Sequence, residues 1–386
     1  MHSNAQFPIK DFPSKDVSQS IFPISPIDSN PEKSEYDMIV FCHLRWDFVY
    51  QRPQHIISRL ANYIRILFVE EPILRAEEGN SVRVINDNLH VLQPNISDIE
   101  DLDGVLYDLL GSTELPIAWF YSPSFGGVMN AFNFSTIVYD CMDELSLFKG
   151  APKKLIEQEL SLLKKATVVF TGGKSLFEAK FPLHPDVHCF PSSVDMEHFS
   201  KAQNGISIPL EMEPITSPVI GYYGVVDERM DLQLIEEAAK LLPDCSFVFI
   251  GPVVKIQEDE LPKLPNIHYL GIKPYSMLPN FLKGFHIAMM PFALNESTKY
   301  ISPTKTLEYM AAGKPIISTH IRDVVRDYSG CVRLINNAQE FVMETQKILN
   351  KEVRPKTNLY ESILKKTSWD TTVCKMRTIL KETVRK

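Results

Sequence analysis

Short apolar runs alternate along the chain with polar loops and with stretches whose apolar residues recur at helical spacing. In the first half these runs predict strands at 37–43, 64–69, 82–85, 90–92, 117–121, 136–139, 168–171 and 187–190. In the second half they predict strands at 219–223, 246–250, 267–270, 286–290 and 315–318. Strands that are apolar at nearly every position and alternate with helices are typical of parallel sheets covered on both faces. The pattern therefore predicts an α/β fold.

Changes in composition divide this pattern into two α/β domains. Residues 1–36 hold five prolines among polar residues and predict a mobile N-terminal arm. The first domain is expected over 37–200 and the second over 219–366, with a polar, proline-containing linker at 201–218 between them. The tail, 367–386, predicts an amphipathic helix that could cross back to the first domain.

The overall composition agrees with two domains, and the net charge limits the kinds of partner that the protein is expected to bind. The chain has 386 residues, of which 44% are hydrophobic, enough for two separate cores. Lys and Arg number 40 and Asp and Glu number 48, so the net charge of −8 disfavours nucleic acid as a partner. The six cysteines are scattered without a CxxC pair, which indicates a reducing compartment and neither disulfides nor a zinc cage.

No apolar run approaches the ~20 residues of a membrane-spanning helix, and the N-terminus lacks a basic region followed by a hydrophobic one. A cytoplasmic protein is therefore expected. The stretch 151–165 has lysines at both ends and leucines at helical spacing. It predicts an amphipathic helix that packs on the sheet, with the alternative of a peripheral contact at the inner face of the plasma membrane.

A short helix is predicted within the stretch 302–313. Ser302 is suited to cap this helix, Pro303 to occupy its first turn, and Gly313 to end it in a left-handed conformation. The first N–H groups of a helix and the positive end of its dipole favour an anion such as a diphosphate.

Thr304, Lys305 and Glu308 share one face of this predicted helix. Lys305 adds a cation beside the helix N-terminus, and Glu308, one turn further along, could accept hydrogen bonds from a ribose diol. Together with Ser302, these residues predict a nucleotide site. The ordinary alternative is a surface ion pair between Lys305 and Glu308.

Two further loops of the second half follow predicted strands and carry candidates for the same site. Gly224 permits a close turn, and Arg229 could reach the diphosphate from the side opposite Lys305. Lys255 is a weaker candidate for a phosphate contact. The chain has neither a GxGxxG motif nor a GxxxxGK[ST] motif, so an ordinary dinucleotide-binding domain is disfavoured and P-loop NTPases are excluded.

In the first half, the loop after the first predicted strand carries Asp47 and Arg52. Arg52 could meet a phosphate and Asp47 a sugar hydroxyl of a second substrate. The alternative is that Trp46 packs in the core while the charged side chains of this loop are solvated.

Three carboxylates, Asp140, Asp143 and Glu144, follow another predicted strand. Carboxylates that lie close together raise one another's pKa and can act as an acid, a base or an acceptor for sugar hydroxyls. The alternative is that Asp140 or Asp143 caps a helix.

Three motifs together resemble retaining glycosyltransferases with the GT-B fold, of the glycosyl transferases group 1 type. These are PSSVDMEHF at 191–199, the Gly-x-x-Gly of 221–224 followed by Arg229, and SPTKTLEYMAAGKPII at 302–317. The stretches RWDFVYQRPQH and VYDCMDELSLFKGAP are similar to a bacterial subgroup associated with cell-surface polysaccharide or teichuronic acid synthesis. The resemblance implies two Rossmann-like domains that face each other across a cleft.

The resemblance also implies roles for particular residues. Glu308 would hold the nucleotide ribose, while Arg229 and Lys305 would neutralise the leaving diphosphate, so that no metal ion is required. Asp143 corresponds to the aspartate of the family's His-Asp pair and is expected to act in catalysis.

The sequence departs from the family pattern at three places. Tyr300 stands where the family often has a second glutamate, for which Glu296 could compensate. Met142 stands in place of the histidine of the His-Asp pair, and Ser192-Ser193 replaces an Asn-Gly. These departures leave nucleotide binding in place but put the chemistry at the sugar in question.

The expected function is therefore transfer of a sugar from a nucleotide-diphosphate sugar to a glycan or lipid-linked acceptor. The donor would bind mainly to the second domain and the acceptor to the loops of the first. Two alternatives stay open: a nucleotide-sugar epimerase of the same fold, and a non-catalytic subunit that binds nucleotide sugars.

Overall fold

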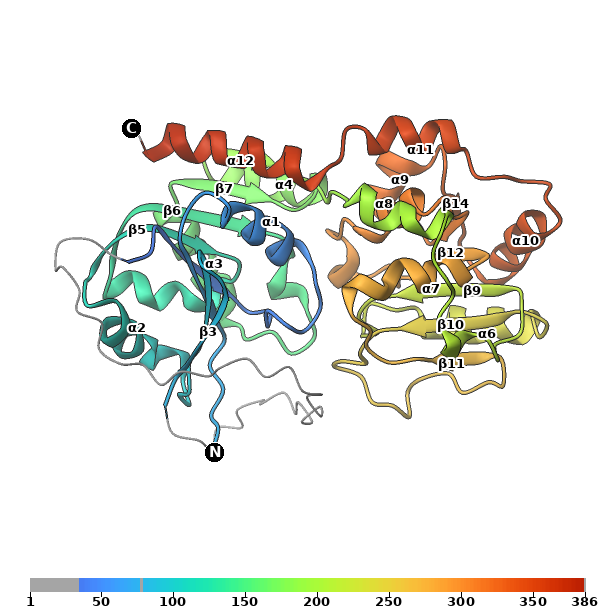
Figure 1. The fold of residues 1–386 in the computed structure, drawn as a ribbon, viewed down its shortest axis with the longest axis horizontal. Helices are drawn as coiled ribbons and strands as arrows, with labels where there is room; N and C mark the ends of the chain where they lie inside the picture. The colour runs from blue at the N-terminus through green and yellow to red at the C-terminus, as the bar shows by residue number, and fades with distance from the viewer. Residues whose placement is uncertain (1–34, 77–78, 385–386) are drawn as a thin grey trace. The chain divides into compact units, whose positions relative to one another are not determined.

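The computed structural model describes residues 35–76 and 79–384, which form two α/β units (Figure 1). Unit 1 comprises the described residues of Met1–Gly172, Phe177–Cys189 and Val373–Lys386, and unit 2 comprises Gly173–Leu176 and Phe190–Thr372. Residues 190–218, expected to close the first domain and form the linker, thus belong to unit 2. All but the last two residues of the arm expected over 1–36 lie outside the described residues.

The sheet of unit 1 has eight strands in the order β3-β4-β2-β1-β5-β6-β7-β8. Every neighbouring pair is parallel except β3 and β4, so one antiparallel strand lies at the edge of an otherwise parallel sheet. β1 and β2 are buried at every position, as the uninterrupted apolar runs predict. The strands are β1 (Met38–Cys42), β2 (Ile66–Glu70), β3 (Ser81–Asn86), β4 (Leu89–Gln93), β5 (Glu114–Phe120), β6 (Asn133–Cys141), β7 (Val168–Thr171) and β8 (Val187–Cys189).

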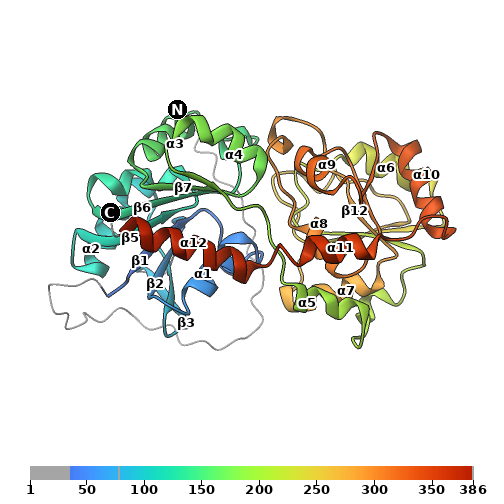
Figure 2. The same ribbon diagram turned by 90° about the horizontal axis from the view of Figure 1, so that it is seen from above.

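Helices connect these strands, and Figure 2 shows α1 and α12 over one face of the sheet. The first helix has a proline, Pro53, in its first turn, where its missing N–H leaves no hydrogen bond unmade, and Gln51 and Gln54 form a capping box at its start. The helices that carry residues of unit 1 are α1 (Arg52–Leu60), α2 (Leu102–Leu110), α3 (Lys154–Lys165), α4 (Lys174–Lys180) and α12 (Trp369–Val384).

The sheet of unit 2 has six parallel strands in the order β11-β10-β9-β12-β13-β14. This is the strand order of a Rossmann fold, and the order reverses between β9 and β12. Ligands of such sheets bind outside the carboxyl ends of the strands at this reversal. The strands are β9 (Val219–Tyr223), β10 (Ser246–Ile250), β11 (Ile267–Tyr269), β12 (Ile287–Met290), β13 (Ile316–Ser318) and β14 (Arg333–Leu334).

Seven α-helices of the described chain lie within unit 2. One of them, α6, starts at Leu232, because the Asp231 side chain accepts a hydrogen bond from the Leu234 N–H and caps it there. The helices are α5 (Met196–Ser200), α6 (Leu232–Leu241), α7 (Leu278–Gly284), α8 (Lys305–Ala311), α9 (Arg322–Tyr328), α10 (Ala338–Leu349) and α11 (Thr357–Leu364).

The prediction that Ser302 caps the helix within 302–313, which is α8, is wrong. α8 begins at Lys305 with Thr304 as its cap residue, and the N–H of Thr306 bonds to the carbonyl of Pro303 in a tighter turn. The carbonyl of Ser302 instead accepts a hydrogen bond from the Ser192 hydroxyl. Gly313 does adopt the expected left-handed conformation after the helix, with a φ of 68°.

No helix within residues 35–76 and 79–384 is long and apolar enough to cross a bilayer.

Candidate functional site

The loop after β9 lies at the strand-order reversal of unit 2 and turns at Gly224. This residue has a φ of 135°, and its N–H bonds to the carbonyl of Ile250 at the end of β10. The following loop turns at Gly251, where a Cβ would stand only 2.0 Å from the carbonyl oxygen of Gly224. Glycine at both positions therefore lets the two loops touch at the edge of the sheet.

Lys305, at the start of α8, extends along this glycine turn. A Cβ at Gly224 would stand 2.3 Å from Cε and 2.6 Å from Nζ of Lys305, so the side chain occupies the space that glycine leaves. The Nζ atom also lies 5.5 Å from the centre of the Tyr222 ring, within the range of a cation–π interaction. Two motifs that are far apart in the sequence thus meet in one place.

Glu308 is buried one turn further along α8, with 7% of the residue exposed. Its Oε2 accepts a hydrogen bond of 2.6 Å from the Tyr223 hydroxyl. Burial raises the pKa of the Glu308 carboxyl, while the Lys305 cation and the Tyr223 hydrogen bond oppose that rise. The alternative of an exposed ion pair between Lys305 and Glu308 is wrong, because the carboxylate is not on the surface.

Arg229 lies in the same loop as Gly224, and its guanidinium is held by a bidentate contact with the buried Asp227. Nε donates to both carboxylate oxygens at 3.0 Å, and Nη2 donates to Oδ2 at 2.7 Å. The Arg229 carbonyl accepts from the N–H of Ala293, which ties this loop to the one after β12. A bidentate carboxylate fixes the plane of a guanidinium, so Asp227 orients Arg229.

Lys255 follows Gly251 and has a left-handed backbone, with a φ of 64°. Its Nζ lies 3.8 Å from Oε1 of Glu228. Its positive charge is therefore partly offset by the Glu228 carboxylate, in the loop that carries Arg229.

The loop before α8 is held by Ser192, one of the residues that depart from the family pattern. The Ser192 hydroxyl donates to the carbonyl of Ser302 at 2.7 Å and accepts from the Thr304 hydroxyl at 3.1 Å. Ser302 and Thr304 are thus brought next to the segment that leads into α5.

In unit 1, Arg52 and Asp140 form a buried ion pair at the carboxyl edge of the sheet. Nη2 of Arg52 lies 2.8 Å from Oδ1 of Asp140, and Nε donates to both carboxylate oxygens. Asp140 belongs to β6 and is fully buried, so the alternative that it caps a helix is wrong. The nearby Tyr121 hydroxyl is buried without a hydrogen-bond partner among the described residues, and burial raises the pKa of this phenol.

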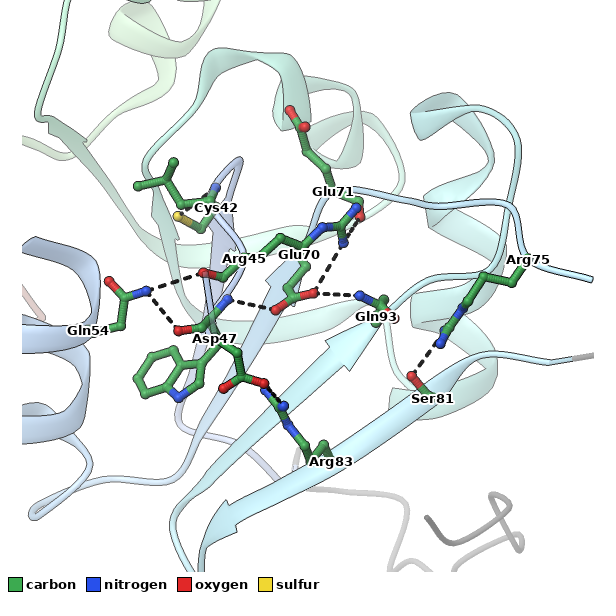
Figure 3. Close-up of polar contacts among 12 residues, drawn as sticks. Cys42, Arg45, Asp47, Gln54, Glu70, Glu71, Arg75, Ser81, Arg83 and Gln93 are labelled. Atoms are coloured by element: carbon green, nitrogen blue, oxygen red, sulfur yellow. Dashed lines mark hydrogen bonds and ion pairs between the residues drawn. The ribbon is translucent and has the colours of Figure 1, made fainter. Parts of the chain in front are cut away.

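Glu70, at the end of β2, organises the loop that follows β1 (Figure 3). It accepts hydrogen bonds from the Arg45 guanidinium at 3.1 Å and from the Trp46 N–H at 2.8 Å. Trp46 packs its ring edge-on against Phe68, as the packing alternative predicts. The second part of that alternative, solvated charges, is wrong for Arg52, which is buried against Asp140. Asp47 is more exposed and pairs with the guanidinium of Arg83.

The carboxylates of Asp140, near the end of β6, and of Asp143 and Glu144, after it, do not form one cluster. Glu144 pairs at 2.7 Å with the buried Lys180, which pairs at the same distance with Glu159 on α3. Asp143 is partly buried, and its backbone carbonyl accepts a weak hydrogen bond from the Cys141 thiol. The three acidic residues are therefore in three different environments.

Sequence reasoning missed Tyr222, Tyr223 and Asp227 as members of the site. The two tyrosines were visible only as apolar strand positions. An aspartate two residues before an arginine in a predicted turn was a signal for the ion pair with Arg229. In the part of the chain that the structure describes, no group of three or more His, Cys, Asp or Glu side chains is placed to hold a metal ion.

Comparison with known protein families gives a match that lies within unit 2. Residues 217–351 match the family model described as Glycosyl transferases group 1. This segment is a glycosyl transferases group 1 domain. It contains β9, the Gly224 loop, Arg229 and all of α8, so these candidate residues of unit 2 lie within the matched region.

The chain is also 26% identical over 221 residues to TuaH of Bacillus subtilis (strain 168), which is named as a glycosyltransferase of teichuronic acid biosynthesis. The match covers 53% of this chain and 55% of TuaH, so the chain spans about half the length of the curated relative it matches.

Solved structures match over nearly the whole chain. Sucrose-phosphate synthase from Thermosynechococcus elongatus has a TM-score of 0.68 at 13% identity, covering 89% of this chain and 98% of that one. An E. coli trehalose-6-phosphate protein bound with UDP-2-fluoro glucose has a TM-score of 0.65 at 11% identity, covering 90% and 99%. HepE from Anabaena, solved with UDP and glucose, has a TM-score of 0.64 at 12% identity, covering 90% and 100%. The chain has the GT-B fold.

Proposed function

We propose that the protein transfers a sugar from a nucleotide-diphosphate sugar to a hydroxyl of a glycan or lipid-linked acceptor in cell-surface polysaccharide synthesis. The observation that carries the proposal is the convergence of Lys305 and Glu308 on the Gly224 loop within a glycosyl transferases group 1 domain. The ligands named for the E. coli and Anabaena structures, UDP-2-fluoro glucose and UDP with glucose, support a nucleotide-sugar donor.

In the proposed donor complex, Lys305 and Arg229 contact the diphosphate and Glu308 accepts hydrogen bonds from the ribose. Ser302 and Thr304 shape the loop beside the nucleotide, Gly224 lets the diphosphate approach the backbone, and Lys255 supplies a more distant positive charge. These roles follow from charge and position at the carboxyl ends of the strands.

The proposed reaction breaks the bond between the anomeric carbon and the diphosphate oxygen, and forms a bond from that carbon to the acceptor oxygen, whose proton passes to the departing diphosphate. Negative charge develops on the departing diphosphate, where the two cations stabilise it without a metal ion. We propose Asp143 as a catalytic residue of unit 1 and retention of the anomeric configuration, as in the family that the motifs resemble.

On the acceptor side, the surroundings of the candidate residues suggest different roles. The buried pair of Arg52 and Asp140 is proposed to stabilise the sheet edge that carries the acceptor loops. Asp47, which is largely exposed, is proposed to accept a hydrogen bond from an acceptor hydroxyl.

A peripheral contact with the inner face of the plasma membrane is part of the proposal. On α3, Ile156 and Leu160 expose about half of their surface and are flanked by Lys153 and Lys164. An apolar pair with lysines on either side favours an anionic bilayer surface.

The test is donor binding and sugar transfer with a panel of UDP-, GDP-, ADP- and dTDP-sugars. K305A and R229A should each lower the transfer rate by ~10²-fold. K240A is the matched control, since Lys240 is an exposed lysine on α6 that pairs with Glu236. Full transfer activity in both K305A and R229A would refute the proposed mechanism.

The same assay separates the two alternatives. An epimerase would exchange a sugar proton with solvent, so deuterium in the recovered sugar would support it. This alternative is weakened by the engagement of Asp140 and Glu144 in ion pairs, because each carboxylate already faces a cation of its own unit, Arg52 or Lys180. Binding of a nucleotide sugar without transfer or hydrolysis would support a non-catalytic subunit.

A further inference from the structure

Two tyrosines follow one another at the end of β9 and point to opposite faces of the strand. The ring of Tyr222 faces the ammonium group of Lys305, and the hydroxyl of Tyr223 meets the carboxylate of Glu308. The tandem tyrosines therefore contact the two charged side chains of α8 separately.

The ring of Tyr223 is fixed by aromatic neighbours. The ring of Phe199 stacks on it with centroids 6.2 Å apart, and the ring of Tyr309 packs edge-on at 5.3 Å. The Tyr223 N–H also points to the Tyr309 hydroxyl at 3.4 Å. With its ring held in this way, the direction of the Tyr223 hydroxyl is set before any ligand arrives.

We propose that Tyr223 is a positioning residue for the nucleotide ribose: its hydroxyl holds Oε2 of Glu308, so that Oε1 is aimed at the ribose diol. This inference rests on the proposed function. The terminal torsion of a glutamate is broad, so without a fixed donor the plane of the carboxylate would vary, and with it the direction in which Oε1 accepts.

The chemistry of Tyr223 and Glu308 favours a role of this pair in ribose binding over a purely structural role. A buried carboxylate destabilises a fold unless several donors satisfy it, and within residues 35–76 and 79–384 the hydrogen bond found to Glu308 comes from Tyr223. Burial raises the pKa of the Tyr223 phenol well above its ordinary value, so the hydroxyl stays a donor throughout the accessible pH range. A ribose diol brings the two additional donors that the carboxylate requires.

The test compares nucleoside diphosphates with and without the diol. Wild type, Y223F, E308Q and the double variant are titrated with whichever of UDP, GDP and ADP binds the wild type, and with its 2′,3′-dideoxy analogue. Y223F keeps the ring and its packing but removes the donor. It should lower the preference for the ribose form about tenfold while leaving the dideoxy affinity within about twofold of wild type.

Y360F is the matched control, because the buried Tyr360 hydroxyl donates to the carbonyl of Lys314 and does not contact Glu308. Y360F should keep the wild-type preference for the ribose form over the dideoxy analogue. In the E308Q background, Y223F should have no further effect on the preference, since both changes act on one interaction.

The outcomes separate this inference from the proposed function. If the wild type binds no nucleotide, the proposed function fails. If it binds and discriminates, but Y223F discriminates equally well or weakens both ligands to the same extent, then Tyr223 has only a structural role and the inference is refuted.

Discussion

The side chain of Lys305 fills the space in which a side chain at Gly224 would stand. The two residues are 81 positions apart in the sequence, yet a Cβ at Gly224 would lie 2.3 Å from Cε of Lys305. The glycine is thus required by the backbone, which has a φ of 135°, and by the lysine that passes over it.

G224A should therefore displace Lys305 and strain the turn. We expect nucleotide affinity to fall at least tenfold and the free energy of unfolding to fall by ~2–3 kcal/mol, measured by titration and urea denaturation. G271A is the control, because Gly271 also has a positive φ but a Cβ there meets nothing within 4 Å. Equal losses of affinity in the two variants would contradict the proposed contact between Gly224 and Lys305.

D227N should weaken the binding of diphosphates more than that of monophosphates. The neutral amide keeps the shape of Asp227 but loses the charge-assisted pair that orients Arg229. We expect nucleoside diphosphate affinity to fall about fivefold to tenfold and monophosphate affinity to change less than twofold. D244N, at an exposed aspartate before β10, should leave the affinities for the diphosphate and the monophosphate unchanged. A loss that is equal for the two nucleotides would show that Asp227 does not act through Arg229.

Much of the strand framework was predictable from the sequence. β7, β9 and β10 have the predicted bounds, because each is apolar or aromatic at almost every position between polar loops. β14 was missed because two residues, one of them Arg333, carry no periodic signal. The start of α8 was misplaced because Thr304 occupies the cap position, which several nearby polar residues could equally have filled.

The site was predictable in part. Gly224, Arg229, Lys305 and Glu308 stand after strands or in a short helix that a parallel sheet brings to one edge. Which side chains touch was not predictable. The pairing of Arg52 with Asp140 joins residues 88 positions apart, and the contact of Tyr223 with Glu308 depends on which face of β9 each tyrosine takes.

D140N should destabilise unit 1 strongly. It leaves the Arg52 guanidinium, 7% exposed, buried beside a neutral amide. Removing one partner of a buried ion pair destabilises a fold by ~3–5 kcal/mol, which urea denaturation would measure. E35Q, which breaks the partly exposed pair with Arg65, should have an effect of less than ~1 kcal/mol. If D140N were as mild as E35Q, the buried pair would not stabilise the edge of the sheet.

Lys314 should make the stability of the protein rise with pH in the alkaline range. Its ammonium group donates to the carbonyls of Phe285 at 2.7 Å and Lys283 at 3.1 Å, and burial lowers its pKa to about 8. In the unfolded chain a lysine has a pKa of ~10.4. Between these two values the unfolded state binds more protons than the folded state, so the free energy of unfolding increases as the pH rises.

K314M removes this titration. The unfolding free energy of the wild type minus that of K314M should therefore increase as the pH rises from about 8 toward ~10.4. Below pH about 8 the difference should be flat, because both states of the wild type are then protonated. Urea denaturation across this range measures the difference, and the buried tyrosines cancel because both proteins contain them. K240M, at an exposed lysine, should differ from wild type by the same amount at every pH. A difference for K314M that stays constant or shrinks with pH would mean that Lys314 keeps an ordinary pKa in the folded protein.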